Sequence, residues 1–254
     1  MKARIRFAKT GAMRFVGHLD ISRFFQKAFR RTGLPLSYSE GYSPHILLTF
    51  ASPLSVGMTS EGEYMDIVLA GEIPLGELWG KLSAELVDGL AVTDIVRLKE
   101  DAKTPMAILR AASYQISPGR CDPALWAYMT KSAQELLAEE KILMLKKSKK
   151  GEREVDIRPL ICDLYADGEE RIMMTTAAGS TAHLKPELVV TALAGKAASS
   201  AGCGPESLPA ADTLNFRFHR TDLLGVDPQI LKPGEPRTDE PLESLIALDK
   251  QSEA

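Results

Sequence analysis

Two histidines near the start of the chain have side chains suited to proton transfer or to hydrogen bonding with a ligand. His18 comes two residues before Asp20, where we expect a helix to begin, and His45 follows Pro44 in a loop. The usual pKa of histidine lies close to neutral pH, so a positioned histidine is a common general acid or base. A structural hydrogen bond is the alternative for both residues, because catalysis also needs a partner group and a substrate. The sequence leaves both interpretations open.

A cluster of basic residues gives the first fifth of the chain a second kind of chemistry. Residues 1–50 contain nine Lys or Arg and two acidic residues, a net charge of +7, although the whole chain has 31 basic and 34 acidic residues. Cations interleaved with aromatic side chains are typical of surfaces that neutralise phosphates and stack bases. The alternative is a solvated face that only favours solubility. The RNA-binding residues that we expect are Arg4, Arg6, Arg14, Arg23, Lys27, Arg30, Arg31, Tyr42 and His45.

Familiar cofactor and metal sites have no signal in this sequence. Cys121, Cys162 and Cys203 lie far apart, so we expect neither a disulfide framework nor a zinc or iron–sulfur site. The chain has no Walker-type glycine loop, no dinucleotide-binding Gly-x-Gly-x-x-Gly and no Gly-x-Ser-x-Gly nucleophile elbow. The sequence therefore predicts no cofactor and no metal.

Length and composition favour a folded chain without membrane spans. The 254 residues are 44% hydrophobic, enough for the core of one large domain or two ordinary ones. The longest apolar stretches are too short or too charged for the about 20 residues that a bilayer requires. Cations are also scattered through the first residues, where a signal peptide would have an apolar segment. We expect a cytoplasmic protein.

A strand and a helix are expected to position the basic residues. Polar and apolar residues alternate over 2–7, which predicts a strand with its apolar residues inward and its three cations, including Arg4 and Arg6, outward. Asp20 is expected to cap an amphipathic helix that ends near Arg31, with its basic residues away from the core. The sequence thus predicts a basic strand face beside a basic helix.

Further elements complete a β-α-β-β-α-β order. After an extended region at 35–50, the composition predicts a turn at Ser60–Glu63, a strand at 64–69, a helix between Pro74 and Gly89, and a strand at 92–98. This order predicts a ferredoxin-like module, with both helices on one face of an antiparallel sheet.

The rest of the chain is expected to form a second α+β module and a tail. The expected elements are strands at 114–117, 142–147, 155–165, 171–176 and 215–220 and helices at 122–140 and 186–195. The predicted fold class is therefore α+β with tandem ferredoxin-like (βαββαβ) modules. The expected domains are a ferredoxin-like module with a basic face at 1–104, a second α+β module at 105–224, and an acidic, proline-containing, disordered tail at 225–254.

Short motifs carry a resemblance to a known family. They are Arg14–Asp20 (RFVGHLD), Gly33–His45 (GLPLSYSEGYSPH), Leu54–Gly57 (LSVG), Glu61–Asp66 (EGEYMD), Val155–Pro159 (VDIRP) and Phe218–Thr221 (FHRT). On these motifs the chain resembles the bacterial radical-SAM-linked proteins over most of residues 1–225. The acidic tail is not part of the resemblance.

The resemblance implies a partner more than a reaction. Members of that family are encoded next to, or fused with, a radical SAM protein that has a cobalamin-binding-like region. The cysteines of this chain are too dispersed for a [4Fe–4S] cluster, so the radical chemistry would belong to the partner. Together with the basic segment, the resemblance predicts a non-catalytic accessory protein that binds tRNA or rRNA and works with a radical SAM enzyme in RNA modification.

Two alternatives stay open. The chain is also similar in element order to the tandem ferredoxin-like endoribonucleases that process CRISPR repeat RNA, although it has no clear counterpart of their C-terminal glycine-rich loop. That similarity implies a metal-independent endoribonuclease with His18 as acid or base, aided by Tyr42 or His45. The other alternative is a protein-interaction scaffold whose loop at 39–45 docks the radical SAM partner.

Overall fold

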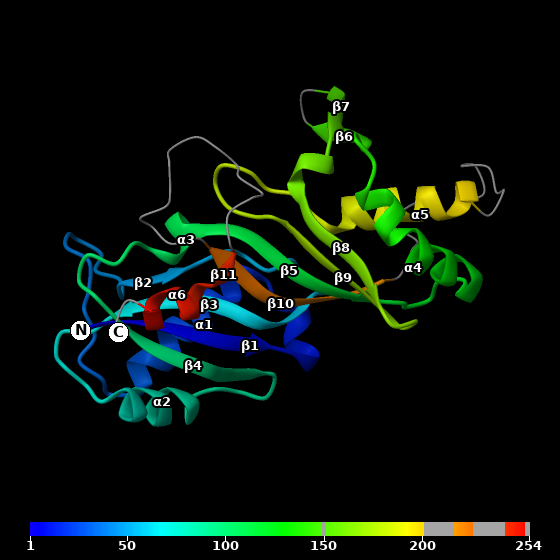
Figure 1. The fold of residues 1–254 in the computed structure, drawn as a ribbon. Helices are drawn as coiled ribbons and strands as arrows, with labels where there is room; N and C mark the ends of the chain where they lie inside the picture. Colours follow the sequence, from blue (N-terminus) through cyan, green and yellow to red (C-terminus); the bar gives the residue numbers. More distant parts are fainter. Residues whose placement is uncertain (149–150, 201–215, 226–241, 252–254) are drawn as a thin grey trace. The chain divides into compact units, whose positions relative to one another are not determined.

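The computed structural model describes residues 1–148, 151–200, 216–225 and 242–251 and shows a mixed α+β chain (Figure 1). The chain divides into two compact units. The first unit contains residues 1–110 and the described residues from Arg220 onward, and the second contains the described residues from 111 to 219. The first unit therefore uses both ends of the described chain, whereas the sequence predicted a module boundary at 104/105 and assigned residues up to 224 to the second module.

The first unit contains a mostly antiparallel sheet. Its elements are β1 (Lys2–Lys9), the 3-10 helix η1 (Gly11–Phe15), α1 (His18–Arg31), β2 (Leu48–Phe50), β3 (Thr59–Val68), α2 (Leu75–Ser83), β4 (Leu90–Leu98), α3 (Pro105–Ile108), most of β10 (Arg217–Gly225), β11 (Glu243–Ser244) and α6 (Leu245–Gln251). The strand order is β4-β1-β3-β10, with β2 also paired to β3 and β11 to β10. β1 is antiparallel to both neighbours, so Phe7 lies opposite Glu63 on β3 and Val92 on β4.

One face of this sheet carries the hydrophobic core of the unit. The inward residues of β1, which are Ala3, Ile5 and Phe7, are all buried, as their alternation predicts. α1 covers them with apolar side chains at helical spacing, among them the fully buried Phe25 and Phe29. The Phe7 and Phe25 rings meet edge-on with centroids 4.8 Å apart. This packing leaves the opposite face of α1 in solvent.

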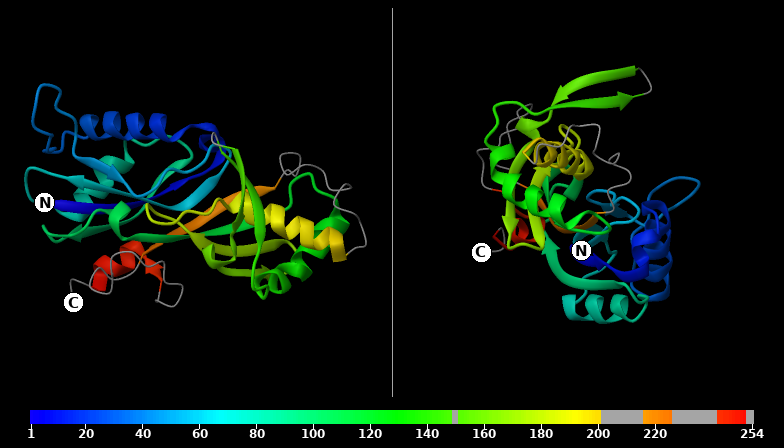
Figure 2. Two further views of the ribbon diagram at one scale, coloured as in Figure 1. Left: turned by 90° about the horizontal axis from the view of Figure 1, so that it is seen from above. Right: turned by 90° about the vertical axis from the view of Figure 1, so that its right-hand side faces the viewer.

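The other face of the sheet is covered as well, which corrects the prediction of helices on one face only. In both views of Figure 2, α1 and α6 lie on opposite sides of the strands of this unit. Leu245 and Ile246 at the start of α6 are buried. Residues 243–251 are thus ordered, although they belong to the segment expected to be a disordered tail, because their apolar side chains pack on the unit. Residues 226–241 and 252–254 of that segment lie outside the described residues.

Two local predictions in the first unit are wrong for physical reasons. α1 begins at His18 with Gly17 in the capping position, so Asp20 lies in the first turn, where its charge still suits the positive end of the helix. β3 continues through Ser60–Glu63, where small and acidic residues predicted a turn. These residues are extended because β3 has strand neighbours on both sides.

The second unit combines a sheet, a separate hairpin and two helices. Its elements are β5 (Leu109–Ser117, which begins in the first unit), α4 (Pro123–Leu137), β6 (Leu143–Ser148), β7 (Gly151–Asp156), the 3-10 helix η2 (Arg158–Leu160), β8 (Ile161–Asp167), β9 (Arg171–Ala177) and α5 (Pro186–Ser200). The sheet order is β5-β9-β8, and β6 and β7 form a two-stranded hairpin. The Asp122 side chain accepts a hydrogen bond from the Ala124 N–H at 2.8 Å, which confirms the predicted helix cap.

Two of the three cysteines lie among the described residues. Cys121 and Cys162 are free thiols of intermediate exposure, and Cys203 lies outside the described residues. None of the helices that the structure describes combines the length and the hydrophobicity needed to cross a membrane.

Candidate functional site

The solvent face of α1 gathers the basic residues that the sequence predicted for it. Arg23, Lys27, Arg30 and Arg31 are exposed, and at 100° per residue they fall on the side opposite the buried phenylalanines. Two of them have acidic partners: Arg23 pairs with Asp20 at 3.2 Å and Arg31 with Glu85 at 2.5 Å. Lys27 and Arg30 have no ion pair with any described residue. The face therefore offers net positive charge on a rigid element.

Arg4 and Arg6 on β1 do not lie on that exposed face, which corrects the prediction of an outward basic strand. Arg4 is fully buried, and its guanidinium binds both Asp66 carboxylate oxygens, at 2.8 and 3.1 Å. Arg4 also donates to the Lys103 carbonyl at 3.0 Å. An outward position on β1 is buried because α6 and the segment before α3 cover this side of the sheet.

Arg6 is half-buried and Arg14 is exposed. Arg6 donates to the Thr221 carbonyl at 3.2 Å and lies 3.7 Å from the Asp222 carboxylate, so its charge is already balanced. The Arg14 guanidinium stacks over the Phe15 ring, 4.7 Å from its centroid, and both side chains are exposed. Of these two arginines, only Arg14 presents its charge freely to solvent.

The loop at 39–45 is closed by hydrogen bonds and presents an aromatic side chain. The Ser39 N–H donates to the His45 carbonyl at 2.8 Å, and the Ser39 hydroxyl lies 2.8 Å from His45 Nδ1. Midway between these residues, the side chain of Tyr42 is fully exposed. His45 thus has a structural contact within the loop, whereas Tyr42 is available to a ligand.

A small cavity lies beside the start of α1. Its lining residues are Phe7, Lys9, His18, Ile21, Phe50, Leu54 and Glu63. It has room for about one water molecule. Phe7 and Glu63 are opposed in register, so their side chains share a face of the sheet, and Lys9 follows two residues after Phe7. The His18 ring packs edge-on against Phe50, with centroids 5.3 Å apart.

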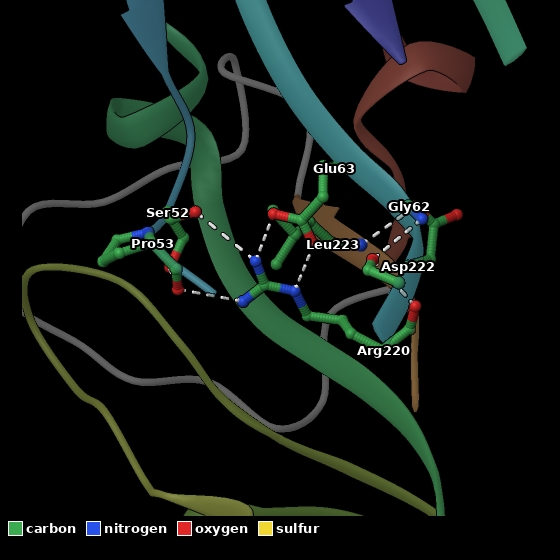
Figure 3. Close-up of polar contacts among 8 residues, drawn as sticks. Ser52, Pro53, Gly62, Glu63, Arg220, Asp222 and Leu223 are labelled. Atoms are coloured by element: carbon green, nitrogen blue, oxygen red, sulfur yellow. Dashed lines mark hydrogen bonds and ion pairs between the residues drawn. The ribbon is translucent and has the colours of Figure 1, made fainter. Parts of the chain in front are cut away.

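Glu63 is bound by Arg220 from β10, a strand far from it in the sequence (Figure 3). Arg220 donates from Nε to Glu63 Oε1 at 2.8 Å and from Nη2 to Oε2 at 2.5 Å, and both residues are buried. The same guanidinium donates to the carbonyls of Ser52 and Pro53, each at 3.4 Å. A carboxylate bound on two oxygens by arginine is oriented as well as neutralised.

The approach of β10 to β3 that allows this pair depends on a glycine. A Cβ on Gly62 would lie 2.5 Å from both the Asp222 Cα and the Thr221 carbonyl oxygen. Such a distance is far below van der Waals contact. Gly62 is therefore required by packing, and β10 could not pass here beside a larger residue.

Burial shifts the pKa values of the two basic groups in the cavity. Burial lowers the pKa of His18 below its usual value, with Glu63 acting against this change and the cations Arg220 and Lys9 acting with it. Burial also lowers the pKa of Lys9, again opposed by Glu63 and assisted by Arg220. A neutral imidazole can accept a proton, and a buried ammonium can stabilise negative charge. The cavity thus has groups for acid–base chemistry or for anion binding.

Three members of this cluster were not among the predicted site residues. The inward alternation of Ala3, Ile5 and Phe7 continues to Lys9, and this period was the available signal that Lys9 is buried. Glu63 and Arg220 are brought together by the pairing of β3 with β10, and no local residue pattern predicts a pairing between strands so far apart in the chain. Across the described residues, no group of three His, Cys, Asp or Glu side chains is placed to hold a metal ion.

The fold and the site define a mixed α+β protein with a basic helix beside a buried charged cluster. A family model described as "Uncharacterized protein conserved in bacteria (DUF2344)" matches residues 2–186, and the chain belongs to this family. The matched region contains α1, the loop at 39–45, Lys9 and Glu63, and it ends before Arg220. No curated protein matches the sequence.

Proposed function

We propose that this chain is a non-catalytic accessory protein that binds RNA, either tRNA or rRNA, and works with a partner radical SAM enzyme in RNA modification. The observation that carries the RNA-binding part is the exposed basic face of α1, on which Lys27 and Arg30 have no ion pair with a described residue. The partner, a radical SAM enzyme with a cobalamin-binding-like region, is proposed from the resemblance in the sequence motifs.

The spacing of the cations on α1 suits a polyanion. Along the helix axis, Lys27 lies about 6 Å from Arg23, and Arg30 lies about 4.5 Å further on. Each cation that neutralises a phosphate releases counterions and makes the affinity dependent on salt. Because the helix is fixed by its buried face, binding need not order it first, which favours affinity.

An exposed aromatic residue complements this charge. Tyr42 is fully exposed in a loop that Ser39 and His45 close through hydrogen bonds. Base stacking on an exposed aromatic ring adds about 1–3 kcal/mol and tolerates any base. The proposed contacts are therefore phosphates on Arg14 and α1 and an unpaired base on Tyr42, and Arg4 is omitted because it is buried in an ion pair.

The test is crosslinking in the native cells. The chain would be purified with its RNA crosslinked in place, and the RNA would be sequenced for wild type and for Lys27→Glu/Arg30→Glu. The matched control is Lys81→Glu/Lys131→Glu, which reverses two exposed cations on α2 and α4. We expect a defined RNA that is lost only in the α1 variant. Equal recovery from both variants would show that α1 does not bind RNA.

The partner needs a separate test on the same preparation. After nuclease treatment, we expect a radical SAM enzyme to co-purify with wild type. A radical SAM enzyme that co-purifies while no RNA crosslinks to the chain would favour the scaffold alternative, with the loop at 39–45 as its docking element. Absence of any such enzyme would contradict the partner.

A second candidate function is a metal-independent endoribonuclease. It is favoured by one observation: His18 and the buried Lys9 line the same cavity, a pairing of a base with a cation that phosphodiester cleavage could use. This candidate predicts RNA cleavage in EDTA that is lost in His18→Ala.

The proposal also includes the fold of the first unit and the cellular location of the protein. For the first unit we propose a ferredoxin-like description, since β4, β1, β3 and β2 follow in that order and α1 and α2 join strands of the sheet. A cytoplasmic location is proposed as well, because a partner in RNA modification would meet its substrate there.

A further inference from the structure

The cavity beside α1 contains a buried cation that no described residue neutralises directly. Lys9 is 2% exposed, and its ammonium makes no hydrogen bond or ion pair with any described residue. The nearby carboxylate of Glu63 is bound on both oxygens by Arg220. A buried charge is costly unless it is paired. Among the described residues that line the cavity, Lys9 therefore has no carboxylate of its own, because Arg220 already binds both oxygens of Glu63.

The same cavity meets the first residue of a long helix. α1 has 14 residues and begins at His18, and its capping residue Gly17 has no side chain to accept from the first amides. The amides of a helix N-terminus and its positive dipole end favour an anion, above all one with several oxygens. His18 and Lys9 both line this cavity, so the start of the helix and the Lys9 side chain border the same space.

We propose that Lys9, His18 and the first turn of α1 form a binding site for a single phosphate group. The cavity itself has room for about one water molecule, so the phosphate would lie at the mouth, between the ammonium and the helix start. A phosphate has enough oxygens to accept from Lys9, from His18 and from a helix amide at once. The phosphate would give the Lys9 ammonium an anion that Arg220 does not already bind.

The phosphate has two possible sources with the same chemistry. One is a free phosphate ion, and the other is a phosphate of an RNA strand bound along the adjacent basic face of α1. The second case rests on the proposed function, since it requires that Arg23, Lys27 and Arg30 guide an RNA to the helix start. The experiment separates the two sources and separates the failure of this site from the failure of RNA binding.

The test follows the ring signals of His18 by NMR with histidine labelling, in the full chain, while inorganic phosphate is added at constant ionic strength. The variants are Lys9→Met, which keeps the packing of the side-chain stem, and Lys131→Met as a matched control at an exposed lysine of α4. We expect a saturable shift in wild type and in Lys131→Met, and roughly tenfold or more weaker binding in Lys9→Met. Circular dichroism would check that each variant folds.

A measurement on wild type alone keeps the test decisive if Lys9→Met does not fold. The carbon next to the Lys9 ammonium reports its pKa, and saturating phosphate should raise that pKa because an adjacent anion favours the charged form. A Lys9 pKa that phosphate leaves unchanged would overturn the site. So would a His18 shift that is linear in phosphate, or one that Lys9→Met does not weaken.

The RNA arm uses one oligonucleotide with and without a 5′-phosphate, on wild type, Lys9→Met and Lys27→Glu/Arg30→Glu. RNA binding that weakens in both variants assigns the site to an RNA phosphate. RNA binding that weakens only in the α1 variant assigns it to free phosphate. If no RNA binds while inorganic phosphate still does, the proposed function fails and the phosphate site stands.

Discussion

Glu63 and Arg220 are 157 residues apart in sequence and form a two-point ion pair inside the first unit, with Nε–Oε1 at 2.8 Å and Nη2–Oε2 at 2.5 Å. Both side chains are nearly inaccessible, at 6% and 3% of their surface. The pair joins β3 to β10, so it connects the N-terminal part of the unit to the segment that returns from the second unit. It also engages Glu63, the carboxylate among the described residues that line the Lys9 cavity.

Removing one member of this pair should destabilise the protein strongly. Glu63→Gln removes the carboxylate that Arg220 binds on two oxygens inside the unit, and we expect a loss of about 3–5 kcal/mol in the free energy of unfolding. Urea denaturation measures this change. Glu72→Gln, which breaks the exposed pair with Arg97, is the control and should cost less than about 1 kcal/mol. Similar losses in both variants would show that the buried pair is not formed.

The close approach of β10 at Gly62 gives a second prediction. Gly62→Ala places a Cβ 2.5 Å from backbone atoms of Thr221 and Asp222, which cannot move as a flexible side chain would. We expect destabilisation by about 1–3 kcal/mol or more, as for other overpacked sites. Gly80→Ala is the matched control: Gly80 lies inside α2 with open space around its Cα, so alanine should stabilise by about 0.5–1 kcal/mol. The midpoint temperature of thermal unfolding should fall in Gly62→Ala and rise in Gly80→Ala, relative to wild type.

The C-terminal segment should contribute to stability, contrary to what its composition predicted. Removal of residues 242–254 exposes the surface of the unit against which Leu245 and Ile246 are buried. It also removes the Leu245 carbonyl, which accepts a hydrogen bond from the buried Arg4. Each fully buried aliphatic side chain contributes about 1.5–3 kcal/mol, so we expect a loss of several kcal/mol. Urea denaturation of the truncated chain tests this. An unchanged midpoint would mean that α6 does not pack on the unit.

His18 should make the stability depend on pH. Burial lowers its pKa in the folded chain, so between that value and about 6.5 the unfolded chain binds more protons. The contribution of His18 to the free energy of unfolding is therefore fully present above about pH 6.5. It decreases as the pH falls toward the pKa of His18 in the folded chain. The charged groups around His18 are Glu63, which opposes the effect of burial on the His18 pKa, and Arg220 and Lys9, which add to that effect. In His18→Gln the loss below pH 6.5 should be smaller than in wild type.

A direct measurement completes this prediction. Titration of the His18 ring by NMR should give a pKa below 6.5. His45→Gln, in the exposed loop, is the matched control for the stability measurements and should keep the wild-type loss of stability at acid pH. A His18 pKa at or above 6.5, or the same acid dependence in His18→Gln as in wild type, would contradict the burial argument.

Local periodicity predicted the parts of the fold that neighbouring residues determine. The three- and four-residue spacing of Ile21, Phe25 and Ala28 predicted the core face of α1, and the alternation of Ala3, Ile5 and Phe7 predicted the inward face of β1. The exposed basic face of α1 follows from the same spacing. These predictions needed no knowledge of what lies on the other side of the sheet.

Features that depend on distant pairing could not be predicted in this way. The alternation of β1 predicts Arg4 to be an outward cation, yet Arg4 is buried because Asp66 lies opposite it on β3 and the start of α6 lies against its guanidinium. The acidic and proline-rich composition of the tail likewise hid the short apolar run that forms α6. Lys9 continues the alternation of β1, but lysine is rarely fully buried, so its residue type does not predict the burial that the structure shows.

The RNA-binding proposal makes a quantitative prediction about salt. If Lys27 and Arg30 each neutralise one phosphate of a single strand, then replacing either residue by Gln should reduce the slope of log affinity against log salt by about 0.7. Tyr42→Ala should instead weaken binding at every salt concentration by about 1–3 kcal/mol without changing the slope, because stacking releases no counterions. Filter binding or fluorescence anisotropy over a salt series separates the two effects. Identical slopes in wild type and in Lys27→Gln/Arg30→Gln would remove α1 from the interface, and a slope change in Tyr42→Ala would show that the loop at 39–45 acts through charge.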